Sequence, residues 1–215
     1  MLPHFDLAQS VMLLIPMLLS LTVHEWAHAW SAYRLGDDTA AMQGRLTLNP
    51  IPHIDLLGTL ILPLLGIPFG WAKPVPVNPT RFRRSVSMST GMLITAAAGP
   101  AANVVLALAS AVALGVVAHF SPEVLLKPMG VAALLRGLIS INVTLAIFNM
   151  VPVPPLDGSR VVDGLLPYGW RSTWESVVRL SPVLLIVVMV FGSTIIAGPS
   201  NYVMGLLDRV IVSMI

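Results

Sequence analysis

The sequence contains no cysteine and few charged residues. Without cysteine there is no disulfide framework, thiolate nucleophile or cysteine-ligated metal site, and the redox compartment stays open. Charged residues make up 10% of the 215 residues, against roughly 25% in a typical soluble domain. The 12 Lys and Arg barely exceed the 10 Asp and Glu, and they form no basic stripe. The composition therefore argues against nucleic acid as a partner.

Apolar residues make up more than half of the chain. Hydrophobic residues are 56% of the chain, and the mean hydropathy is +0.85. These values predict an integral membrane protein with the lipid bilayer as its surroundings. The first apolar segment lacks a basic leader and carries the motif discussed below, so we expect no cleavable signal peptide. With no internal repeat and no long polar linker, we expect residues 1–215 to form a single integral membrane domain.

Long apolar segments predict an all-α polytopic membrane protein. A transmembrane helix needs about 20 mainly apolar residues, and about four segments satisfy this: 7–35, 88–118, 129–151 and 174–197. Residues 54–69 are shorter and interrupted by Pro63 and Pro68, which predicts a re-entrant or interfacial segment. Residues 202–215 are too short for a full span and predict an interfacial or poorly packed last helix. Counting both segments would give five or six spans.

Basic residues are distributed unevenly between the connections. Six of them lie in the 34–87 connection, whereas the connection after the second span carries only Lys127. Because Lys and Arg accumulate in cytoplasmic loops, the 34–87 connection is predicted to face the cytoplasm.

The first predicted span contains a His-Glu-x-x-His motif, formed by His24, Glu25 and His28. On a helix, residues four apart lie on one face, so the two imidazoles can hold one metal ion. Glu25 is offset by about 100° and can act as a general base without being a ligand. The alternative is a polar patch satisfied between helices. Ionisable groups are costly inside a bilayer and mark functional sites, which favours the metal hypothesis.

A catalytic zinc usually takes three protein ligands. The candidates for the third ligand are His53, Asp55, Asp157, Asp163 and, on the opposite membrane side, His119. Asp157 is favoured because it follows a proline-broken span on the same predicted side as the histidines. Its alternative role is that of a helix N-cap. For His53 the alternatives are a surface turn or support of the zinc ligands.

Several motifs together resemble the site-2 protease family of intramembrane zinc metalloproteases. The pairing of His24-Glu25-x-x-His28 with Asn149-x-x-Pro-x-Pro-Pro-Leu-Asp157-Gly carries the resemblance. The segments 49–59, 70–77 and 98–103 add further matches. The resemblance covers about residues 18–160. The chain lacks the PDZ and CBS domains of larger members.

The resemblance implies a role for each matched residue. His24, His28 and Asp157 would bind one Zn²⁺, and Glu25 would activate water. Asn149 would hold the substrate or the oxyanion; as an alternative it could hydrogen-bond between helices. Residues 70–77, with Trp71 and Val75, would form a small membrane-associated β-hairpin that presents an extended substrate strand.

The expected function is hydrolysis of peptide bonds in transmembrane substrates in a prokaryotic cell membrane, with the active site toward the cytoplasm. Two alternatives are a metal or proton transporter and a non-catalytic module that binds membrane peptides. A transporter would spread ionisable groups across both membrane halves or show an inverted repeat. A binding module would not need Glu25. Substrate identity and oligomeric state stay open.

Overall fold

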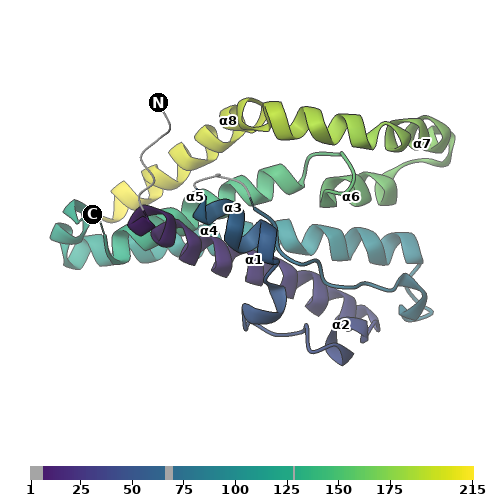
Figure 1. Ribbon diagram of the computed structural model, residues 1–215, viewed down its shortest axis with the longest axis horizontal. Coiled ribbons are helices and arrows are strands. Elements are labelled where there is room, and N and C mark those ends of the chain that lie inside the picture. Colours follow the sequence, from purple (N-terminus) through teal and green to yellow (C-terminus); the bar gives the residue numbers. More distant parts are fainter. Residues whose placement is uncertain (1–6, 66–69, 128) are drawn as a thin grey trace.

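The computed structural model describes residues 7–65, 70–127 and 129–215, and every regular element within them is a helix (Figure 1). The long helices are α1 (Leu7–Leu35), α4 (Met88–Phe120), α5 (Val131–Asn149) and α8 (Ser181–Met214). The shorter α-helices are α2 (Thr39–Met42), α3 (Leu62–Leu64), α6 (Asp157–Leu165) and α7 (Arg171–Arg179). A π-helical turn, η2 (Leu56–Ile61), and the 3₁₀ turns η1 (Ile51–His53), η3 (Pro79–Arg81), η4 (Pro122–Leu126) and η5 (Tyr168–Trp170) complete the list.

The predicted bounds of the first three spans agree closely with the helices. α1 occupies the predicted 7–35, and α4 begins at the predicted Met88 and runs two residues further than expected. Ser87 fixes the start of α4 because its hydroxyl accepts a hydrogen bond from Thr90 N, which satisfies one of the unpaired donors of the first turn. The all-α prediction is therefore confirmed.

Helix α4 lies at the centre of the fold and packs against α1, α5, α6 and α8. Small buried residues on α4, such as Ala107 and Ala111, let its neighbours approach closely. Ile139 of α5 and Ile211 of α8 pack onto the same cluster. This packing brings the middle of α4 against the motif-bearing half of α1.

The predicted β-hairpin at residues 70–77 is wrong, because no β-strand occurs in the described residues. Pro74 and Pro76 each remove a backbone donor that a strand ladder would need. The hydrogen bonds of this segment go instead to side chains and loops elsewhere in the chain, as described below.

The predicted count of about four transmembrane helices is also wrong. By length and composition, the described residues contain two helices able to cross a membrane, α4 and α5. A third span results if residues 168–179 and 181–192, which meet at a bend of 65°, form one broken span. α1 is not among them.

Two shorter predicted segments have different outcomes. Residues 56–64 are helical, in η2 and α3, and α3 packs against α1; residues 66–69 lie outside the described part. Residues 202–215 do not form a separate or poorly packed helix. They continue α8 through Pro199, and Leu207 and Ile211 are buried in the main apolar cluster.

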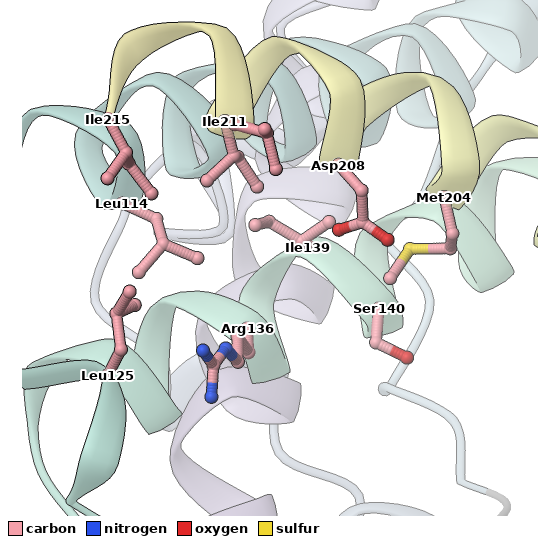
Figure 2. Close-up of a pocket in the computed structure, with 10 residues that line it drawn as sticks. Leu114, Leu125, Arg136, Ile139, Ser140, Met204, Asp208, Ile211 and Ile215 are labelled. Carbon is pink, nitrogen blue, oxygen red and sulfur yellow. The ribbon is translucent and has the colours of Figure 1, made fainter. Parts of the chain in front are cut away.

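A cavity of about 580 Å³ lies between α4, α5, η4 and the C-terminal part of α8. Ile139, Met204 and Ile211 give it apolar walls, and Arg136 and Asp208 contribute opposite charges (Figure 2). None of the predicted site residues lines this cavity. The His-Glu-x-x-His motif therefore lies outside this cavity, and its polar side chains are buried.

Candidate metal centre and active site

The two histidines of the α1 motif face one another on one side of the helix. Their spacing of four residues stacks the imidazoles one turn apart, with ring centroids at 4.6 Å. The Nε2 atoms of His24 and His28 are 3.0 Å apart. Both side chains are buried, with 5% and 8% of their surface exposed.

Asp157, the first residue of α6, completes the cluster. Its Oδ2 lies 3.2 Å from His24 Nε2 and 3.3 Å from His28 Nε2. The connection to α5 is held tightly at this point, because a Cβ on Gly158 would lie 2.3 Å from the carbonyl oxygen of Met150. That close approach requires glycine. Among the described residues, His24, His28 and Asp157 form a group whose ligand atoms lie close enough together to hold one metal ion.

The cluster fits a divalent cation better than it fits a network of hydrogen bonds. His28 Nδ1 lies 2.7 Å from the Thr95 carbonyl oxygen, and His24 Nδ1 lies 2.6 Å from Asn103 Oδ1. Both oxygens are acceptors, so each Nδ1 carries the ring proton and each Nε2 presents a lone pair. The Asp157 Oδ2 has no hydrogen-bond donor in the described residues. When the two rings are neutral, three lone pairs therefore converge at this point.

The separations between these atoms agree with zinc geometry. Ligand bonds of about 2.0–2.1 Å in a tetrahedral arrangement place neighbouring ligand atoms roughly 3.3 Å apart. The three measured separations run from 3.0 to 3.3 Å. Two imidazoles and one carboxylate are also a common ligand set of catalytic zinc, which keeps a fourth position open.

Gly99 on α4 leaves the space that the two imidazole rings occupy. A Cβ at this position would lie 2.5 Å from His28 Nε2 and 2.7 Å from His24 Cε1. Contacts this short do not occur between real atoms, so any larger residue would push the rings away from Asp157. The glycine is therefore a requirement of the cluster and not only of helix packing.

Glu25, the acid of the motif, binds to the segment of residues 70–78, which we call the strap. Its Oε2 accepts a hydrogen bond of 2.8 Å from Val75 N. Glu25 is buried, with 8% of its surface exposed. The nearby Arg45 is also buried, at 6% exposed. Burial lowers the pKa of the Arg45 guanidinium, and the negative charge of Glu25 opposes this shift.

The rest of the strap is anchored by hydrogen bonds at alternate residues. Lys73 N donates to the His53 carbonyl oxygen, and the Lys73 carbonyl oxygen accepts from the Arg45 guanidinium. The Trp71 carbonyl oxygen accepts from Thr59 Oγ1. Backbone groups of alternate residues point to the same side of an extended chain. The odd-numbered edge of residues 71–75 therefore faces the protein and ends at Glu25, and further along the strap Asn78 N donates to Asp37 Oδ2.

The remaining predicted residues lie outside the three-residue cluster. His53 is 2% exposed, and its Nε2 bonds to the Thr47 carbonyl oxygen, so this side chain supports the loop that holds the strap. The Trp71 ring covers Gly58, where a Cβ would lie 2.4 Å from it. Asn149 donates to the Leu145 carbonyl oxygen inside α5.

Sequence reasoning missed residues that contact the histidines. Asn103 bonds to His24, and Asn142 bonds in turn to Asn103 at 2.6 Å. The same helix as Asn103 supplies the Thr95 carbonyl oxygen and the space at Gly99. The available signal was an asparagine in the middle of an apolar span, since polar groups at that depth mark functional sites.

Comparison with known proteins gives consistent results. The family model for peptidase family M50 matches residues 124–191. The "Putative zinc metalloprotease YwhC" of Bacillus subtilis (strain 168) is 40% identical over 176 residues, which cover 79% of this chain and 75% of the relative.

More distant relatives carry the designation "Putative zinc metalloprotease Rip2". The protein from Mycolicibacterium smegmatis is 34% identical over 154 residues, and the one from Mycobacterium tuberculosis (strain H37Rv) is 31% identical over 153 residues. Each alignment covers 71% of this chain and 56% of the relative, so the chain spans little more than half of either Rip2 protein. No solved structure matches the chain significantly.

Proposed function

Because the chain belongs to peptidase family M50, the site-2 protease family of zinc metalloproteases, we propose that His24, His28 and Asp157 hold its zinc ion and that Glu25 is its general base. The protein is an intramembrane zinc protease. The observation that carries the assignment of residues is the convergence of three potential ligand atoms within 3.0–3.3 Å of one another.

The chemistry divides between the metal and the protein. When bound, zinc supplies the Lewis acid that polarises the scissile carbonyl and makes water a nucleophile near neutral pH. The Glu25 carboxylate takes a proton from the attacking water and later gives it to the leaving amine nitrogen. The hydrogen bond from Val75 N to Oε2 orients this carboxylate, so that Oε1 can receive the proton.

Membrane-embedded proteins are the substrates that the family membership implies, and the lipid bilayer is the surrounding medium. A helical substrate hides each carbonyl in a hydrogen bond to the residue four positions on. It must therefore unwind, and the freed N–H groups need new partners in a dry site. The even-numbered edge of the strap suits this need, because Pro74 and Pro76 cannot donate but present carbonyl acceptors.

The burial of the three ligands favours a proteolytic site over an open binding surface. His24 and His28 are less than one-tenth exposed, and the side chain of Asp157 is 13% exposed. A site with so little contact with solvent strengthens its electrostatic interactions. The alternatives of a transporter and a passive peptide-binding module are not favoured, because the relatives are named as metalloproteases.

Two substitutions test the proposed roles with separate measurements. Glu25→Gln should lower cleavage of a reporter transmembrane substrate by about 10²–10⁴-fold, because it removes the base. The same variant should bind one zinc ion per chain, since Glu25 is not a ligand. Asp157→Ala should lower the zinc content itself. Full zinc occupancy in Asp157→Ala would contradict the proposed ligand set, and cleavage by Glu25→Gln at the wild-type rate would contradict the proposed base.

A further inference from the structure

We infer that Asn103 and Asn142 are positioning residues for the zinc site, and that they fix which nitrogen of His24 can bind the metal. This inference rests on the zinc ligands proposed above. It concerns one side chain on α4 and one on α5. They are linked to His24 through its Nδ1 atom, whereas Asp157 lies near its Nε2 atom. Neither asparagine needs to contact zinc or substrate.

The observation is a continuous chain of buried hydrogen bonds through three helices. His24 Nδ1 bonds to Asn103 Oδ1 at 2.6 Å, and Asn103 Nδ2 donates to Asn142 Oδ1 at 2.6 Å. Asn142 Nδ2 donates to Ser20 Oγ at 2.8 Å, and the Ser20 hydroxyl donates to the Pro16 carbonyl oxygen at 2.6 Å. Asn103, Asn142 and Ser20 each have 0% of their surface exposed.

The direction of every bond in this chain is determined by backbone carbonyl groups, which can only accept. Asn142 Nδ2 also donates to the Leu138 carbonyl oxygen at 2.8 Å, so the Asn142 amide cannot be turned around. Asn103 Nδ2 also donates to the Ser20 carbonyl oxygen at 3.3 Å. With its nitrogen committed there, Asn103 must present its oxygen to His24.

An oxygen facing His24 Nδ1 determines the tautomer of the imidazole. The ring proton stays on Nδ1, and the lone pair stays on Nε2, which points at His28 and Asp157. Free histidine prefers the opposite tautomer, with the proton on Nε2, which cannot bind zinc through that atom. The asparagine chain therefore prepares His24 as a ligand before the metal arrives.

His28 obtains the same result by a different route. Its Nδ1 bonds to the backbone carbonyl oxygen of Thr95, which no side-chain substitution removes. His24 has no backbone carbonyl in this position and relies on Asn103. The two ligands of one site should therefore respond differently to substitution of α4 side chains.

A role confined to helix packing does not explain this arrangement. Asparagines can join membrane helices through hydrogen bonds of modest strength, and such bonds can run in either direction. Here the bonds run in one direction only, from His24 to the carbonyl oxygen of Pro16, and they begin at a zinc ligand. Replacing a residue that hydrogen-bonds to a metal ligand in this way typically lowers metal affinity about 10–100-fold.

The first experiment measures zinc affinity of the detergent-solubilised full chain by competition with a chelator. Asn103→Leu should weaken zinc binding by about 10–100-fold, because it removes the oxygen at His24 Nδ1. Asn142→Leu should give an intermediate loss. Ser110→Ala, a buried polar site on the same helix, is the matched control and should be unchanged. Folding of each variant is checked by thermal unfolding without zinc.

The second experiment observes the tautomer directly in the zinc-free protein. The chain has five histidines, so ¹⁵N-histidine NMR is tractable, and a His24→Gln variant assigns the His24 signals. Wild type should carry the His24 proton on Nδ1, and Asn103→Leu should move part of it to Nε2. This measurement needs neither zinc nor activity.

The outcomes separate this inference from the proposed function. If wild type fails to bind one zinc per chain, the proposed zinc site is wrong, whatever the tautomer. If wild type binds zinc and a folded Asn103→Leu variant binds it equally tightly, the positioning role is wrong. A wild-type His24 that carries its proton on Nε2 would overturn it as well. Should Asn103→Leu not fold, the wild-type tautomer and the zinc affinity of Asn142→Leu still decide.

Discussion

Replacing Val75 with proline removes a single backbone N–H from the candidate active site, and it should reduce cleavage without reducing zinc binding. That N–H donates to Glu25 Oε2 at 2.8 Å. Val75 lies between Pro74 and Pro76, so the local chain is already stiff and another proline adds little new constraint. The substitution therefore comes close to deleting one hydrogen bond to the proposed general base.

The expected size of the effect follows from the charge of the acceptor. A hydrogen bond to a charged group contributes about 1.5–3 kcal/mol, and about 1.4 kcal/mol changes a rate tenfold. If the bond is needed to align Glu25 in the transition state, Val75→Pro should lower kcat by about 10- to 150-fold. Zinc content should remain at one per chain, because no hydrogen bond links Val75 to the three proposed ligands in the described residues.

Two control variants isolate the N–H group. Val75→Ala keeps the N–H and removes most of the side chain, so it should cleave at close to the wild-type rate. Val77→Pro places the same ring two residues further along the strap, where it does not touch the bond to Glu25. The assay is single-turnover cleavage of a reporter transmembrane substrate in detergent or proteoliposomes. Equal cleavage by Val75→Pro would refute the reasoning, because the hydrogen bond would then not be needed. Faster cleavage would also refute it, because it would mean that Val75 holds Glu25 in an inactive arrangement.

The helices were predictable because their signals are local. The bounds of α1 follow from a long, mainly apolar segment that ends at Arg34 and Gly36, and the start of α4 follows from Ser87, a favoured N-cap residue. The closeness of the two motif histidines was predictable for a related reason. A spacing of four residues on a helix fixes the relation of His24 to His28 without any knowledge of the tertiary structure.

The strap was mispredicted because its partners are distant in the sequence and are not strands. The alternation of residues 71–77 resembles a strand, and the alternation of their hydrogen bonds is indeed that of an extended chain. Its donors and acceptors, however, are matched by Glu25, Arg45 and the loop at His53. A propensity for extended structure does not show which groups form hydrogen bonds with the backbone N–H and C=O groups.

The bonding partners of His24 were missed for the same physical reason. Asn103 lies 79 residues from His24, and Asn142 lies a further 39 residues along the chain. Periodicity can place each asparagine on a helix face, but it cannot say that α1, α4 and α5 approach at those positions. Only the packing of three helices brings the amides into contact, so this part of the site needed the structure.

Further predictions concern the space around the cluster and its side of the membrane. Gly99→Ala should abolish zinc binding, because its Cβ would lie 2.5 Å from His28 Nε2. The control Gly205→Ala, whose Cβ would have no atom within 4 Å, should bind zinc normally. Normal zinc binding by Gly99→Ala would contradict this packing. For sidedness, Ser87→Cys and Ser121→Cys place single thiols at opposite ends of the 33-residue α4, roughly 50 Å apart. His28 contacts α4 only eight residues from Ser87, at Thr95, so the metal cluster lies near that end. The basic connection before α4 predicts that this end faces the cytoplasm. A membrane-impermeant thiol reagent applied outside cells should therefore label Ser121→Cys and spare Ser87→Cys. The opposite labelling would put the active site on the outer side of the membrane and would rule out release of products into the cytoplasm.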